Sequence, residues 1–170
     1  MIKLYSFLLI IFFSINTFAH QPRLNEEGDY AMSKDDPYII KDPEISKAIY
    51  STLDGAEHFY KIKSDEDFNM YAGITVAKQD DCPDEFQKFS FSILDENFNT
   101  LHAFDGESFK WWSWYEEYGK KWYWVGPEYG ADFKSTNIFK KGTYYLKVNN
   151  NSNQGNYVLA VGDIEKFNAL

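Results

Sequence analysis

The sequence predicts an all-β protein, an antiparallel jelly-roll-like β-sandwich with a short helical aromatic insertion. Two observations predict the sandwich: apolar residues recur at every second position in many short runs, and turn-forming residues separate those runs. A third observation, the placement of all five tryptophans between Trp111 and Trp124, predicts the insertion. A hydrophobic content of 44% and an aromatic content of 19% suffice for a packed core. We therefore expect a single domain over residues 20–170.

Residues 1–19, MIKLYSFLLIIFFSINTFA, are typical of a secretory signal peptide. Lys3 precedes the apolar run Phe7–Phe13, and small residues lead to a cleavage point after Ala19. The apolar run is shorter than the roughly 20 residues that a membrane span needs. We expect a secreted or periplasmic protein that has no stable membrane span once the signal is cleaved.

Several runs alternate between apolar and polar residues, as strands with one buried face do. The expected buried residues are Phe68, Met70, Ala72, Ile74 and Val76, then Phe89, Phe91 and Ile93, then Tyr144, Leu146 and Val148. The run NYVLAVG is apolar on both faces, which favours a central strand. Further strands are expected at Ile49–Leu53, His58–Lys63, Thr100–Phe104 and Lys121–Val125.

Two stretches favour a helix. DPEISKAIY offers Asp42 as an N-cap and Pro43 as the first helical residue. In the aromatic insertion, a helix over 110–118 would place one stripe of rings on the sandwich, at Trp111, Trp114, Tyr115 and Tyr118. Trp112 would then face solvent. In the strand-like WYWV that follows, Trp122 and Trp124 face opposite to Tyr123.

Two closing runs carry a family resemblance. Leu53 and Gly55 form a Leu-x-Gly turn, followed by Phe59 and Tyr60 in the next run. The closing pattern consists of Gly142, Tyr144, Leu146 and Val148, then Gly155, Tyr157, Leu159 and Val161. In these features the chain resembles the bacterial pre-peptidase C-terminal domain, over about two-thirds of residues 20–170.

The resemblance implies a jelly-roll-like sandwich that is not itself catalytic, that accompanies an exported enzyme and that sometimes holds calcium. The chain departs from the family pattern because it carries no enzyme domain and inserts about residues 108–135 before the final hairpin. It is also similar to small uncharacterised exported bacterial proteins with this layout, a similarity that implies no function.

No nucleophile elbow, phosphate-binding loop or zinc-protease motif occurs in the sequence, so we do not expect an enzyme. Cys82 lies in an acidic turn that disfavours a thiolate, and as the only cysteine it has no disulfide partner in the chain. Glu116 and Glu117 are adjacent, which suits a solvated surface better than a paired-carboxylate site.

Two metal sites are conceivable, although no cofactor is required. Cleavage would make His20 the N-terminal residue, whose amine and imidazole could bind copper together with His58 or His102. The segment QDDCPDE gathers oxygen ligands for calcium at Asp80, Asp81, Asp84 and Glu85. A frayed terminus and a solvated loop are the plainer interpretations.

The formal net charge of −9 argues against nucleic acid as a partner, because phosphate binding needs a basic surface. We expect an exported non-catalytic binding module that recognises a glycan or a protein partner through Trp112, Trp122, Tyr123 and Trp124. The alternatives are a copper-handling protein that uses His20 and an envelope structural protein.

Overall fold

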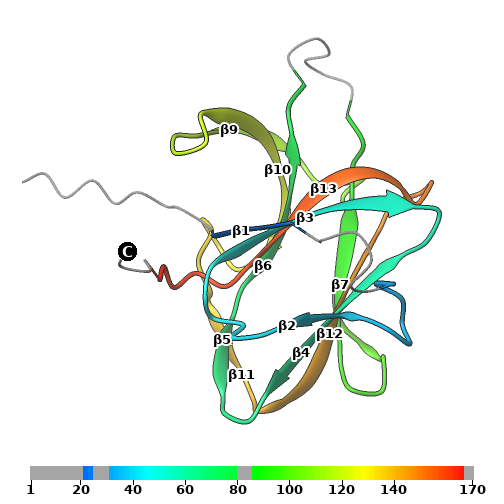
Figure 1. Cartoon of the computed structure of the whole chain (residues 1–170), viewed down its shortest axis with the longest axis vertical. Helices are drawn as coiled ribbons and strands as arrows, with labels where there is room; N and C mark the ends of the chain where they lie inside the picture. Colours follow the sequence, from blue (N-terminus) through cyan, green and yellow to red (C-terminus); the bar gives the residue numbers. More distant parts are fainter. Residues whose placement is uncertain (1–20, 25–30, 80–85, 167–170) are drawn as a thin grey trace, which may run out of the picture.

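The computed structural model describes residues 21–24, 31–79 and 86–166, and over these ranges the chain is built from strands and turns without a helix (Figure 1). Accordingly, none of the described segments is a helix long and apolar enough to cross a membrane. The all-β fold class predicted from the alternating runs is confirmed.

Six strands form the larger sheet in the order β1-β3-β13-β6-β10-β9. In that order they span Gln21–Leu24, Lys47–Asp54, Gln154–Val161, Ala72–Ala77, Lys121–Tyr129 and Trp112–Glu116. Neighbouring strands are antiparallel except at the β1 edge, where β1 runs parallel to β3. The apolar run NYVLAVG lies in β13, inside the sheet, as predicted.

Five strands form the second sheet in the order β2-β4-β12-β7-β8. In that order they span Tyr38–Ile40, His58–Ser64, Gly142–Asn149, Ser90–Leu94 and Thr100–Phe104. Here β2 runs parallel to β4, and the other pairs are antiparallel. A separate pair joins β5 (Phe68–Met70) to β11 (Asn137–Phe139).

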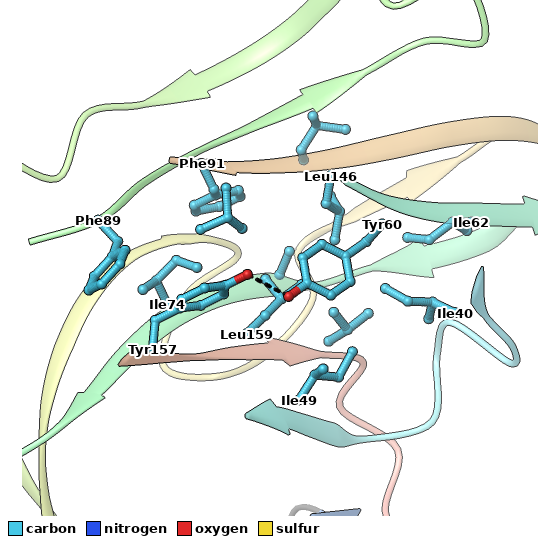
Figure 2. Close-up of a cluster of buried hydrophobic side chains, with 14 of the residues drawn as sticks. Ile40, Ile49, Tyr60, Ile62, Ile74, Phe89, Phe91, Leu146, Tyr157 and Leu159 are labelled. Atoms are coloured by element: carbon cyan, nitrogen blue, oxygen red, sulfur yellow. Dashed lines mark hydrogen bonds between the residues drawn. The ribbon is translucent and has the colours of Figure 1, made fainter. Parts of the chain in front are cut away.

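The two large sheets bury their facing sides in one hydrophobic cluster (Figure 2). Ile49, Ile74 and Leu159 come from the larger sheet, whereas Phe91 and Leu146 come from the second sheet. All of these side chains are almost completely inaccessible to solvent. The arrangement is consistent with a β-sandwich whose core lies between the sheets.

The predicted strand through residues 68–76 is divided between two sheets at Tyr71. Its predicted apolar side is buried throughout, and Asn69 is exposed on the other side. Thr75 is also buried, because β6 is an inner strand that is covered on both faces, and Tyr71, which lies between β5 and β6, is buried as well. Tyr71 satisfies its hydroxyl by donating to Glu128 Oε2 at 3.0 Å.

The predicted aromatic helix is wrong, because residues 112–116 form the edge strand β9 and residues 121–129 form β10. The two strands make an antiparallel hairpin in which Trp114 lies opposite Tyr123. Aromatic residues favour strands, where each ring packs against a cross-strand neighbour. The carboxylate of Glu116 accepts hydrogen bonds from the backbone amides of Tyr118 and Gly119. These bonds close the turn of the hairpin.

The predicted helix in DPEISKAIY is also wrong. Asp42 has a φ of 49° and is followed by a turn rather than a helix. Strand β3 begins at Lys47, whose ammonium donates to the carbonyls of Asp42 at 2.6 Å and Ile45 at 3.0 Å. Local N-cap signals are outweighed here because β3 pairs with β13 along its whole length.

Candidate functional site

The aromatic hairpin presents different rings on its two faces, because successive residues of a strand point to opposite sides. Trp122 lies opposite Tyr115, and this pair shares a face with Trp124. Trp112, Trp114 and Tyr123 lie on the other face. The four residues predicted to form one ligand surface, Trp112, Trp122, Tyr123 and Trp124, are therefore divided between two faces.

One face of the hairpin forms part of the outer side of the larger sheet, away from the core between the sheets. Tyr123 is only 6% exposed, and its hydroxyl lies 3.1 Å from that of Tyr50 on β3. Trp114 packs on Tyr123 and on Phe133, with ring centroids 6.1 and 5.0 Å apart. Trp112 also contacts Phe133 but is 43% exposed. Tyr123 is therefore a packing residue on this face.

The other face carries the more exposed pair of rings. Trp122 is 51% exposed and Tyr115 is 39% exposed, and their ring centroids are 5.1 Å apart. The ammonium of Lys78 lies 4.0 Å from the centroid of Trp124 and 5.9 Å from that of Trp122. Trp124 is half-buried because it stacks on Phe86 at 4.8 Å. We call Trp122, Tyr115, Trp124 and Lys78 the aromatic wall.

The stripe predicted to dock on the sandwich is only partly correct. Trp111 and Trp114 are half-buried as expected, and Trp112 is exposed as expected. Tyr115 and Tyr118 are exposed instead of docked, and Tyr118 is 79% exposed in the hairpin turn. In a strand, residues 111, 114, 115 and 118 do not share one side, so the helical spacing has no structural meaning here.

The larger sheet forks next to the aromatic wall. Strand β13 pairs with β3 along its whole length, but it pairs with β6 only over Val158–Val161. Strand β6 remains paired with β10 as far as Ala77. Figure 1 shows β13 diverging from β10 beyond this point. A cleft of about 1280 Å³ lies at the fork.

The two sides of the cleft differ in chemistry. Lys78 and Trp124 of the aromatic wall line one side, together with Phe86. Thr52, Gln154 and Asn156, on β3 and β13, line the other side, which we call the amide wall. The Thr52 hydroxyl donates to Asn156 Oδ1 at 2.6 Å. A half-aromatic, half-amide lining is suited to ligands with flat apolar faces and many hydroxyl groups.

A buried polar network lies at the inner end of the cleft. Tyr60 and Tyr157 face each other across the core, and their hydroxyl oxygens form a hydrogen bond of 2.6 Å (Figure 2). The Tyr157 hydroxyl also lies 2.8 Å from His58 Nδ1, and Ser51 Oγ lies 3.2 Å from the same nitrogen. This network was not predicted from the sequence. Its only sign there is that some strand residues whose side chains alternation places inward, such as Tyr60 and Tyr157, end in a polar group.

Burial determines the protonation of the network. It raises the pKa of the Tyr60 and Tyr157 hydroxyls, so both remain donors at neutral pH. Burial lowers the pKa of His58, which favours the neutral ring, and a neutral ring can accept the hydrogen bond of the Tyr157 hydroxyl at Nδ1. The Ser51–His58 contact lacks a carboxylate among the described residues that would orient the ring for nucleophilic catalysis. The geometry suits a structural network.

We expect the free energy of unfolding to fall as the pH drops below about 6.5. The unfolded chain then protonates His58 at its ordinary pKa of 6.5, whereas the native state resists because burial lowers that pKa. Above this pH the stabilisation is fully present. Denaturant unfolding at about pH 7 and about pH 5.5 measures the loss. His58→Gln should reduce the pH dependence, and an unchanged dependence would contradict the assignment.

The histidines predicted to bind copper are not neighbours in the described part of the chain. His58 is on β4 and His102 is on β8, with β12 and β7 between them. Three strand spacings correspond to roughly 14 Å. The His102 ring packs on Tyr129 and Phe139. His20 lies outside the described residues, so the copper site stays a prediction.

The calcium ligands predicted from QDDCPDE also lie outside the described residues, as does Cys82; they are Asp80, Asp81, Asp84 and Glu85. Within the described ranges, no group of three or more histidine, cysteine or acidic side chains is placed to hold a metal ion. Glu116 caps the turn of the hairpin, as a solvated structural residue would.

A comparison of the chain with protein-family models finds no match, and a search of curated proteins finds none either. The resemblance to the pre-peptidase C-terminal domain stays a prediction based on the sequence motifs.

Proposed function

We propose that the protein is an exported, non-catalytic module that binds glycans through the aromatic wall. The observation that supports this most is the exposure of Trp122 and Tyr115 on the same hairpin face as Trp124, which lines the cleft. Exposed aromatic rings stack on the apolar faces of sugar rings. Such a contact binds the sugar and needs no catalytic group. The jelly-roll-like topology and the accessory role implied by the family resemblance are part of this proposal.

The aromatic wall is held in place before any ligand arrives. Trp122 packs on Tyr115 across the hairpin, and Lys78, the residue after β6, lies over Trp124. Phe86 supports Trp124 from the other side. Rings that are already ordered lose little conformational entropy on binding, which favours a weak, flat ligand such as a sugar.

We expect Trp122→Ala to weaken glycan binding by about tenfold or more, since removing one stacked ring costs on the order of 1–2 kcal/mol. The measurement is retention on a panel of insoluble polysaccharides: peptidoglycan, chitin, cellulose, starch and xylan. Depletion from solution then gives a dissociation constant for any polysaccharide that retains the protein.

Trp112→Ala is the matched control, because Trp112 is a similarly exposed tryptophan on the opposite face of the same hairpin. It should bind as the unsubstituted protein does. Equal losses in the two variants would show that the hairpin acts only through stability. Failure of every polysaccharide to retain the unsubstituted protein would refute glycan binding and favour a protein partner.

A further inference from the structure

We propose that the aromatic wall selects acidic glycans, whose sugar rings carry a carboxylate, over neutral ones, and that Lys78 recognises the charge. This inference rests on the proposed glycan binding and adds the class of sugar and the residue that selects it. Three observations carry it: Lys78 shares a face with the exposed rings, its ammonium is held beside them, and no described carboxylate pairs with it.

Lys78 lies on the same face of the larger sheet as the exposed rings. Strand β6 ends one residue earlier, but the amide of Lys78 still donates to the carbonyl of Trp122 at 2.9 Å and continues the pairing with β10. Val76 lies opposite Trp124 and points into the core. Because side chains alternate along a strand, Lys78 points to this same face, as do Trp122 and its partner Tyr115.

The ammonium of Lys78 is held next to Trp122. It lies 4.0 Å from the ring centroid of Trp124 and 5.9 Å from that of Trp122. A cation in this position is attracted by the electrons of the ring. Phe86 stacks on Trp124 at 4.8 Å, so Trp122 and Tyr115 are the rings left for stacking. A sugar stacked on Trp122 would therefore lie beside a fixed positive charge.

The charge of Lys78 has no acidic partner among the described residues. Over residues 31–79 and 86–166, no ion pair joins Lys78 to a carboxylate. Glu116, in the same hairpin as Trp122, accepts two backbone amides instead. An ammonium has three donors, and its hydrogen bonds to a carboxylate are stronger than those to a neutral hydroxyl. Lys78 should therefore favour a carboxylate at the edge of a stacked sugar ring.

The negative charge of the whole chain does not oppose this contact strongly. The formal net charge is −9, but exposed charges that lie more than about 8–10 Å apart are largely screened at physiological ionic strength. A carboxylate that touches Lys78 lies well within that distance. The acidic sugar is thus recognised by one local cation beside a stacking ring, and a broad basic surface is not required.

The test titrates oligosaccharides of pectate, alginate and hyaluronan by calorimetry, each against its carboxyl-reduced form, in which a hydroxymethyl group replaces the carboxylate. At least one acidic sugar should bind about tenfold more tightly than its reduced form. Lys78→Met should abolish this preference and leave the affinity for the reduced form unchanged, because methionine keeps an apolar side chain on Trp124 without the charge. Lys78→Arg should restore the preference.

Lys61→Met is the matched control, because Lys61 is a similarly half-exposed lysine 5.9 Å from the ring of Tyr145, on β4 of the second sheet. It should keep the preference. Dextran sulfate measures attraction by charge alone, and binding as tight as that of the carboxylate sugars would overturn the inference.

Two further outcomes separate this inference from the proposed function. Equal affinity for acidic and reduced sugars, with dependence on Trp122, would overturn the selection of acidic glycans and leave glycan binding intact. Absence of binding to any polysaccharide, acidic or neutral, would overturn both. Circular dichroism of each variant verifies that the fold is retained.

Discussion

Trp111→Ala should lower the free energy of unfolding by about 3 kcal/mol, whereas Trp112→Ala should lower it by less than about 1 kcal/mol. The two tryptophans are adjacent in sequence but differ in what they contact. The Trp111 ring packs on Phe86 and against Gly126, where a Cβ would overlap it. Its indole N–H donates to the Gly106 carbonyl at 2.7 Å.

The location of these contacts explains the size of the expected effect. Gly106 follows β8 of the second sheet, and Gly126 is in β10 of the larger sheet, so Trp111 connects the sheets along one side. Chemical denaturation of the two alanine variants measures the difference. Equal destabilisation would show that the hairpin is buried as a unit and would leave no exposed binding face on it.

Tyr157→Phe should cost about 2 kcal/mol of stability although only one oxygen is removed. That oxygen serves two partners, the hydroxyl of Tyr60 and Nδ1 of His58. Both tyrosines are almost completely buried, so water cannot replace the lost contact. Tyr145→Phe is the control, because Tyr145 is buried to a similar degree without a hydrogen bond to its hydroxyl in the described structure.

A double-mutant cycle sharpens this prediction. Tyr60→Phe alone should also destabilise the protein, because it removes the partner of a buried hydroxyl. The double variant should lose clearly less than the two single losses combined, since removing both partners leaves fewer unsatisfied groups than removing one. Additive losses would show that the two hydroxyls act independently, against the geometry.

Sequence periodicity predicted the sandwich-like core well, because alternation reports directly on which side of a strand is buried. Phe91, Leu146 and Leu159 lie in the core as expected. In the aromatic stretch the same alternation separates Trp112, Trp114 and Glu116 from Ser113 and Tyr115, but both sides carry aromatic rings, so it does not mark one buried side. Aromatic residues also recur there at spacings of three and four, as on one face of a helix. Over so few residues the helical period cannot be told from the strand period of two.

The cleft could not be predicted from the sequence, because it depends on where two strands stop pairing. Nothing in GITVA or GNYVLAV shows that β13 pairs with β6 only from Val158 onward. The aromatic wall was found from composition alone, since Trp122 and Trp124 were predicted as ligand residues. Thr52 on β3, Asn156 on β13 and Lys78 just after β6 could not be predicted as cleft residues, because only the folded sheet brings these segments together.

The central position of β13 has a consequence for how the chain folds. This strand comes last among the described strands in sequence. In the sheet, however, it lies between β3 and β6 and pairs with both. The larger sheet therefore cannot close until the last strand has emerged, and folding from the N-terminus onward cannot complete it. Such distant pairing favours slow folding, on the order of milliseconds to seconds. Until then, β3 and β6 expose open edges that can pair with other chains, so truncation before residue 154 should produce aggregates.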